Sequence, residues 1–132
     1  MAPKPPESLL PLTPAVLHIL LVLADGERHG YAIAQEVEAI SDGQVRMGPG
    51  TLYGSILRMT ESELLEEVTT RRREDGEERR RYYQLTAFGK RVLTLELDRL
   101  TAVLNVARRK HLLSAPLPGA PLLHPPLAEG SA

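Results

Sequence analysis

The sequence predicts a mostly α-helical protein with one small β-hairpin, and three observations support this prediction. Every proline except Pro49 falls within positions 3–14 or 116–126, so an ordered body of about a hundred residues lies between two proline-rich ends. Apolar residues recur at intervals of three and four over most of this body, as in amphipathic helices. One Asp75-Gly76 dipeptide, which is typical of a tight hairpin turn, interrupts the helical pattern.

A first helix is predicted to begin after Thr13, because Thr13 can cap it and Pro14 suits its first turn. Apolar residues then keep helical spacing through Ala24. The apolar run 15–24 is too short to span a membrane, and the segment before it lacks the basic character of a secretion signal. We therefore expect a buried helix in a cytoplasmic protein that has no membrane partner.

A second helix is predicted from Gly30, and His29 is expected to cap it. A third helix opens at 48–51, where two glycines and a proline leave its N-terminus open to an anion such as phosphate. Its apolar side is formed by Leu52, Ile56 and Met59. Its positions outside the core are mostly small, hydroxylic or basic, which suits phosphate contacts and hydrogen bonds to base edges. These positions are Thr51, Tyr53, Gly54, Ser55, Leu57 and Arg58.

The segment 68–83 carries six arginines around the Asp75-Gly76 turn and predicts an arginine-rich hairpin. Counting outward from the turn gives the predicted pairs Val68–Tyr83, Thr69–Tyr82, Arg71–Arg80 and Arg72–Arg79. Opposed arginines repel each other, which favours a hairpin that grips phosphates, and an ordinary solvated ribbon is the alternative. Because strand side chains alternate, Arg81 should share the face of Tyr83 and pair with an internal acid.

A long helix is predicted from a Thr86 cap to about Leu113. Part of its apolar surface follows a 4-3-4-3 spacing that suits a partner helix, through Leu93, Leu97, Leu100, Leu104 and Ala107. Further apolar residues widen this surface beyond one stripe, so the helix needs two neighbours. A second subunit is the simplest second neighbour, and a helix packed wholly within its own domain is the alternative.

Three helices followed by an arginine-rich hairpin match the winged helix-turn-helix plan. In that plan the third helix enters the major groove of DNA, and the hairpin, or wing, contacts the flanking backbone. The chain then divides into four predicted parts. These are a disordered N-terminal tail (1–12), the winged helix-turn-helix domain (13–85), a C-terminal dimerisation helix (86–113) and a disordered proline-rich tail (114–132).

Three motifs resemble the PadR family of transcriptional regulators, in its compact branch with a single C-terminal dimerisation helix. They are His29-Gly30-Tyr31, Gly50-Thr51-Leu52-Tyr53, and Arg81-Tyr82-Tyr83 followed by Leu85-Thr86 and Gly89. The resemblance implies a homodimeric regulator of double-stranded DNA, usually a repressor, which a small hydrophobic effector releases in some members. It also implies DNA contacts from Tyr31, Thr51, Tyr53, Ser55, Arg58, Arg71, Arg72, Arg73, Arg79 and Arg80.

The chain departs from this family pattern at three places. Glu63 stands where glycine is usual after the third helix, and Leu57 stands where a polar, DNA-facing residue is usual. Four glutamates lie beside the expected DNA face, namely Glu61, Glu63, Glu66 and Glu67. This acidic cluster should weaken non-specific binding to DNA, and it also suits contact with a protein partner.

The composition argues against several other classes of function. The chain has no cysteine and only four scattered histidines, so we expect no enzyme activity, no metal and no cofactor. Its net charge of −1 excludes a uniformly basic surface, so DNA would have to bind a local patch. The alternative function is a winged-helix module that binds proteins without direct operator contact.

Overall fold

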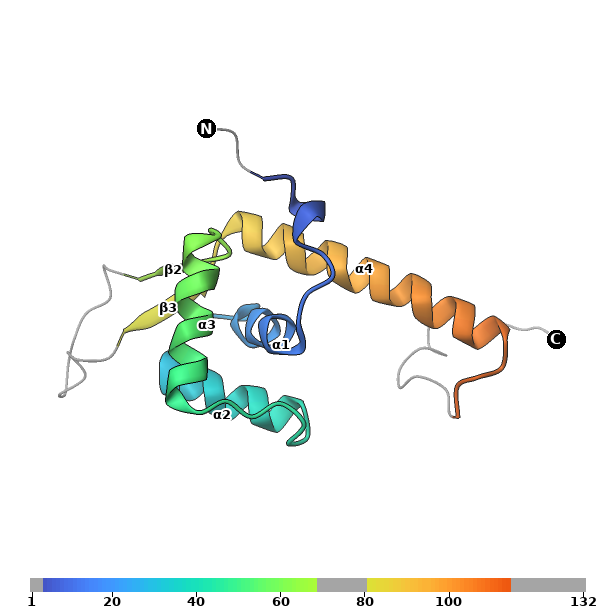
Figure 1. Cartoon of the computed structure of the whole chain (residues 1–132), viewed down its shortest axis with the longest axis horizontal. Helices are drawn as coiled ribbons and strands as arrows, with labels where there is room; N and C mark the ends of the chain where they lie inside the picture. Colours follow the sequence, from blue (N-terminus) through green and yellow to red (C-terminus); the bar gives the residue numbers. More distant parts are fainter. Residues whose placement is uncertain (1–3, 69–80, 115–132) are drawn as a thin grey trace. The chain divides into compact units, whose positions relative to one another are not determined.

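The computed structural model describes residues 4–68 and 81–114 and confirms the predicted fold class (Figure 1). The elements in chain order are η1 (Pro6–Leu9), α1 (Pro14–Leu23), β1 (Arg28–His29), α2 (Gly30–Ile40), α3 (Pro49–Glu61), β2 (Leu65–Glu67), β3 (Tyr82–Leu85) and α4 (Ala87–Arg109). The chain forms two compact units, Met1–Asp98 and Arg99–Ala132, and α4 contributes residues to both. No helix within the described residues is long and apolar enough to cross a membrane.

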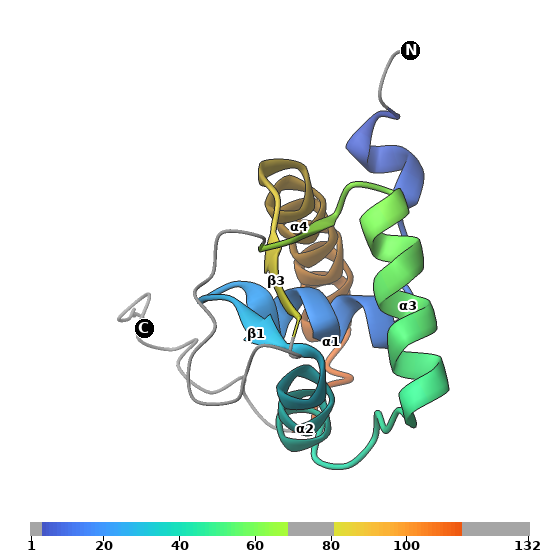
Figure 2. The same cartoon turned by 90° about the vertical axis from the view of Figure 1, so that its left-hand side faces the viewer.

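The first unit contains a three-stranded antiparallel sheet in the order β1-β3-β2, so β3 is the central strand (Figure 2). Glu67 of β2 lies opposite Tyr83, and the Val68 N–H donates to the Tyr82 carbonyl over 2.8 Å. The predicted pairing of Val68 with Tyr83 is therefore wrong by one residue. The Asp75-Gly76 turn and the predicted arginine pairs lie outside the described residues.

Strand β1 is an element that the sequence analysis missed, because two polar residues carry no strand pattern. It pairs with β3, with Arg28 opposite Tyr83 and His29 opposite Tyr82. The Arg28 guanidinium donates to the carboxylates of Glu36 on α2 (2.9 Å) and Asp25 (3.0 Å). The hydrogen bond to Glu36 raises the pKa of Arg28 above its ordinary value. These contacts tie the sheet edge to α2.

The hydrophobic core of the first unit is built around α1, which packs on α2, α3 and β3. The apolar side predicted for α3 does face this core, and so do Ile33 and Val37 of α2, whereas Ile40 at the end of α2 is exposed. The buried side chains of the core are Ile19, Leu20, Val22, Leu23, Ile33, Val37, Leu52, Ile56, Met59, Leu64, Leu65, Tyr83, Val92 and Leu93.

Side chains cap three of the four long helices as predicted. The Val16 N–H donates to Thr13 Oγ1 (3.2 Å), the Ala32 N–H to His29 Nδ1 (3.3 Å), and the Gly89 N–H to Thr86 Oγ1 (2.8 Å). Each bond satisfies a backbone donor that the first turn of a helix leaves without a partner.

Helix α4 ends at Arg109, earlier than the predicted Leu113. His111 adopts a positive φ of 60°, and the Leu112 N–H turns back to donate to the Ala107 carbonyl over 3.0 Å. This arrangement closes a helix at its C-terminus. The predicted tail 114–132 lies outside the described residues beyond Ser114.

The prediction of a disordered tail over residues 1–12 is wrong for its second half. Residues Pro6–Leu9 form η1, and the leucines of this segment pack against the core. The Leu12 N–H donates to a carboxylate oxygen of Glu96 on α4 over 3.1 Å. Glu96 is only 1% exposed, and a buried carboxylate requires hydrogen-bond donors. Its bond with Leu12 therefore helps to order the N-terminal segment.

Four residues join the end of α3 to the start of α4, and we call their contacts the α3–α4 clasp. The Thr86 hydroxyl donates to the Glu63 carbonyl (2.6 Å), and the Thr86 N–H donates to the Leu64 carbonyl (3.1 Å). A Cβ atom at Gly89 would collide with that same Leu64 carbonyl. Glu63 has a positive φ of 65°, which glycine adopts more easily, so the departure from the family pattern places strain at this turn.

Tyr83 lies in the middle of the sheet and is buried. Burial raises the pKa of its phenol above the ordinary value, and the nearby Glu67 carboxylate raises the pKa further, while Arg81 acts in the opposite direction. The neutral phenol is therefore the form that the fold favours.

We predict that Gly89→Ala lowers the free energy of unfolding by about 3 kcal/mol, because the clasp has no space for a methyl group. Urea denaturation at a fixed protein concentration measures this loss. Gly50→Ala is the matched control, since nothing lies within 4 Å of a Cβ at Gly50, and it should raise stability by about 0.5–1 kcal/mol. A Gly89→Ala protein as stable as the natural one would contradict the tight clasp.

We also predict that stability falls as the pH rises above about 10, the ordinary pKa of tyrosine. The unfolded chain loses the Tyr83 proton first, whereas the folded chain keeps it until its raised pKa is passed, so unfolding is favoured in this window. The free energy of unfolding should depend less on pH in Tyr83→Phe above pH 10. Parallel losses in the two proteins would show that this phenol is not responsible.

Candidate nucleic-acid interface

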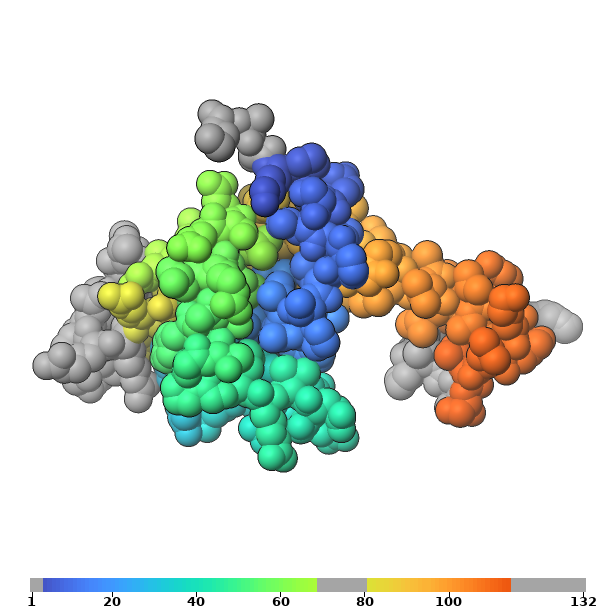
Figure 3. All heavy atoms as spheres, in the orientation of Figure 1, coloured from blue at the N-terminus to red at the C-terminus, as the bar shows by residue number. Residues whose placement is uncertain are grey.

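The N-terminus of α3 is open and lies at the surface of the first unit, where Figure 3 shows the helix in green. Gly48 precedes Pro49 at the helix start, and no side chain caps the first turn. A Cβ at Gly48 or Gly50 would have nothing within 4 Å. The N–H groups of this turn and the helix dipole together favour a negatively charged group such as phosphate.

Tyr53 of α3 rests on Gly30 at the start of α2. A Cβ at Gly30 would lie 2.5 Å from the Tyr53 hydroxyl oxygen and 2.7 Å from a ring carbon, so any side chain at position 30 would require this ring to shift. Two of the motifs noted in the sequence therefore meet in space, with Gly30 from one supporting Tyr53 from the other. Tyr31 comes directly after Gly30 in the chain and is exposed, and much of Tyr53 is exposed as well.

The remaining predicted contacts on α3 have different surroundings. Thr51 and Arg58 are exposed, as a DNA contact requires. Ser55 is only 4% exposed, so the prediction that it contacts DNA is wrong. Its hydroxyl accepts a hydrogen bond from the Arg58 guanidinium over 3.4 Å, and this bond helps to orient the Arg58 side chain. Arg71, Arg72, Arg73, Arg79 and Arg80 lie outside the described residues.

An open hollow of about 190 Å³ separates the N-terminal segment from the second half of α3. Leu9, Leu12 and Val16 form one side of it, and Arg58 and Met59 form the other. The hollow explains the position of Ser55, which lines it and faces the N-terminal segment rather than the open side of α3.

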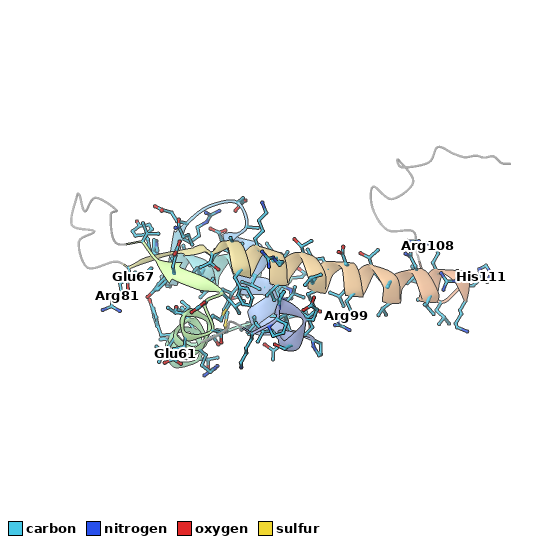
Figure 4. All side chains as sticks on the ribbon, turned by 90° about the horizontal axis from the view of Figure 1, so that it is seen from above. Glu61, Glu67, Arg81, Arg99, Arg108 and His111 are labelled. Carbon is cyan, nitrogen blue, oxygen red and sulfur yellow. The ribbon has the colours of Figure 1, made fainter. Side chains whose placement is uncertain are left out.

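At the base of the predicted wing, two of the four clustered glutamates already have partners. Arg81 pairs with Glu67 over 3.7 Å (Figure 4). Gln84 donates to Glu66 over 2.7 Å. The expected acidic partner of Arg81 is thus present, but the Arg81 side chain is 70% exposed, so its expected internal position is wrong. The Arg81 cation offsets the negative charge of Glu67, whereas the neutral amide of Gln84 leaves the charge of Glu66 in place.

The predicted dimer interface is only partly available on α4. Leu93 is 5% exposed and belongs to the core of its own unit, so its assignment to a dimer interface is wrong. Leu97 is exposed, and Leu100, Leu104 and Ala107 are partly exposed. The sequence analysis missed Val103, which is 54% exposed and lies three residues after Leu100 and four before Ala107, on the same side of the helix.

The described residues contain no group of three or more acidic, histidine or cysteine side chains that could hold a metal ion. His18 uses Nδ1 within its own helix, 2.7 Å from the Pro14 carbonyl oxygen.

Two solved structures have a similar fold. A PadR family transcription regulator from hypervirulent Clostridium difficile is 23% identical, with a TM-score of 0.62, over 74% of this chain and 97% of that one. A transcriptional regulator from Clostridium thermocellum is 21% identical, with a TM-score of 0.58, over 72% of this chain and 87% of that one. At these identities the likeness concerns the fold alone.

A curated relative is an uncharacterized 37.1 kDa protein in a transposon of Streptomyces fradiae. It is 43% identical over 51 residues, which make up 39% of this chain and 14% of that protein. The match thus spans a small part of the relative. Residues 19–95, more than half of the chain, match the model of the "Transcriptional regulator PadR-like family". The chain belongs to the PadR-like family of transcriptional regulators.

Proposed function

We propose that this protein is a transcriptional repressor that binds double-stranded operator DNA as a homodimer. The observation that carries the proposal is the open face of α3, with its uncapped N-terminus and the exposed Thr51, Tyr53 and Arg58. In a winged helix-turn-helix protein this helix enters the major groove. Tyr31 at the start of α2 is exposed and suits a contact with the adjacent backbone.

The charge distribution supports a local DNA-binding patch. The net charge of −1 provides no general attraction to DNA, so affinity has to come from a few arginines. On α3 this role falls to Arg58, which Ser55 orients. The other cations are the predicted wing residues Arg71, Arg72, Arg73, Arg79 and Arg80, whose role stays a prediction from the sequence.

A homodimer would use the exposed aliphatic side chains of α4. Leu97 lies in the first unit, and Leu100, Val103, Leu104 and Ala107 continue at helical spacing in the second. An apolar stripe of this kind packs against the same stripe of another copy. Two copies of α3 related by a twofold axis would read two half-sites, so the operator should be an imperfect palindrome.

The second candidate function is a winged-helix module that binds a protein. Glu61 and Leu57 on the exposed face of α3 favour it, because neither contributes affinity for phosphate. Release by a small hydrophobic effector is not included in the proposal. The hollow beside Arg58 is open to solvent, and a site for a small apolar molecule normally encloses most of its surface.

We predict a steep loss of duplex affinity as salt increases, because binding to phosphates releases counterions. Fluorescence anisotropy with a selected duplex measures the slope of log Kd against log salt. Arg58→Ala should weaken binding about three- to ten-fold and reduce the slope by about 1 for each half-site. Arg72→Ala combined with Arg79→Ala should have a larger effect of the same kind.

Lys90→Ala is the matched control, since it also removes one exposed positive charge, but from a surface formed with residues of the α1–β1 turn. It should bind the duplex nearly as well as the natural protein. The DNA-binding function is contradicted if the natural chain prefers no duplex at low salt. It is also contradicted if all of these variants bind with equal affinity and equal slope.

We further predict that Leu97→Asp combined with Leu104→Asp gives a monomer, because carboxylates in an apolar helix interface are costly to bury. Sedimentation velocity measures the mass, and binding to a palindromic duplex should fall with it. Ala102→Asp is the control. Ala102 is exposed and lies on the opposite side of α4 by helical spacing, so the Ala102→Asp protein should keep the mass of a dimer. A dimeric double variant would contradict the stripe.

A further inference from the structure

Leu57 is an aliphatic side chain that the fold leaves in solvent. It lies on α3 and is 59% exposed. The core-facing side of this helix is already filled by Leu52, Ile56 and Met59, all of which are buried. The stability of the domain therefore does not depend on a leucine at position 57. An alternative use for this side chain has to be found on the outer face of α3.

Two positions that precede Leu57 on that face lack side chains. Residues three and four apart lie in a row along a helix, so Gly50, Gly54 and Leu57 follow one another on the outer face of α3. A Cβ at Gly50 would have open space, and one at Gly54 would meet only the Arg58 guanidinium at 3.5 Å. Leu57 is therefore the first side chain in this row that a surface approaching α3 would touch.

Glu61 continues the same row one turn later. Its negative charge repels phosphates, which limits close contact with DNA to the part of α3 before it. The hydrogen-bonding side chains Thr51 and Arg58 stand beside this part of the row. A duplex bound to α3 would thus meet Leu57 in the middle of the contact, with polar groups on its flank.

The chemistry of the major groove restricts what Leu57 can contact there. Base edges in this groove expose hydrogen-bond donors and acceptors, and the main apolar group among them is the 5-methyl group of thymine. Leucine pressed against a donor or acceptor would remove its water without replacing the hydrogen bond. Against a methyl group, the same leucine buries apolar surface on both sides.

A protein partner fits this position less well than a base edge does. Protein-docking sites usually present a contiguous apolar patch of several hundred Å². Leu57 is the only large aliphatic side chain that α3 exposes. The exposed residues around it are Tyr53, whose ring carries a hydroxyl and lies one turn before it, and the polar Thr51, Arg58 and Glu61. A single aliphatic contact surrounded by hydrogen-bonding groups matches the reading of one base pair.

We propose that Leu57 is a specificity-determining residue that reads the 5-methyl group of a pyrimidine in the operator. The proposal rests on the proposed DNA-binding function and adds what α3 recognises. In ordinary DNA the group belongs to thymine, and in methylated DNA 5-methylcytosine presents the same group at the same place in the groove. Leu57 therefore makes the protein prefer a methylated pyrimidine at one position of each half-site.

The experiment begins with duplexes that the full chain selects from a random pool. Each thymine of the selected site is then replaced singly by deoxyuridine, which lacks only the methyl group, and Kd is measured at fixed salt. At one position in each half-site the natural protein should bind about fourfold less tightly, and about fifteenfold less when both positions are replaced. Leu57→Ala, which removes this contact from both half-sites, should bind the thymine duplex about fifteenfold less tightly and should not respond to the replacement.

Two further measurements complete the test. The first asks whether the methyl group of 5-methylcytosine is read like that of thymine, and the second asks whether the loss of any exposed aliphatic side chain has the same effect as the loss of Leu57. At the sensitive position, 5-methylcytosine opposite guanine should bind about fourfold tighter than cytosine with the natural protein, and equally with Leu57→Ala. Ile40→Ala, which truncates another exposed aliphatic side chain at the end of α2, should keep the full response to deoxyuridine. Thermal unfolding checks that both variants are folded.

The possible failures are distinguishable. If the natural protein prefers no duplex at low salt, the proposed function fails and this inference falls with it. A second outcome is that the natural protein binds a preferred duplex and yet loses no more affinity than Leu57→Ala at any thymine replacement. In that case only the reading by Leu57 is overturned. A selected site without a required thymine or 5-methylcytosine overturns it equally.

Discussion

The close approach of Gly89 to the Leu64 carbonyl is the constraint on which the rest of the first unit depends. At this point α3 has just ended, β2 begins, and β3 has just passed into α4. The absence of a side chain at Gly89 and the two hydrogen bonds of Thr86 hold these segments together in the α3–α4 clasp. The direction in which α3 presents its outer face to a ligand is set at the same junction.

The helices could be predicted well because their signals are local. Thr13, His29 and Thr86 cap helices by bonds to residues three positions later, which a sequence shows directly. Apart from the end of α4, which closes through the local backbone at His111, the main errors concern features that form between distant segments. Strand β1 exists because β3 offers it an edge, and the order at Leu12 depends on Glu96, 84 residues away. Neither partner can be read from the neighbouring sequence.

The candidate site divides along the same line. The spacing of apolar residues shows which side of α3 is exposed, and Thr51, Tyr53 and Arg58 were predicted from it. Ser55 is small and polar, so its pattern does not reveal that the N-terminal segment lies opposite it across the hollow. Similarly, the apolar stripe of α4 does not reveal that its own core uses Leu93 and leaves Val103 uncovered. Tertiary packing decides which of these side chains are covered and which stay exposed.

The contact between Gly30 and Tyr53 has a consequence for how this protein can evolve. The ring of Tyr53 occupies the space where a side chain at position 30 would stand, so a change at either position alters the surroundings of the other. A lineage that acquires a larger residue at position 30 has to move the tyrosine ring or replace it by a smaller side chain. Covariation between these two positions would therefore record the history of α3, even where the DNA sequences recognised by relatives have diverged.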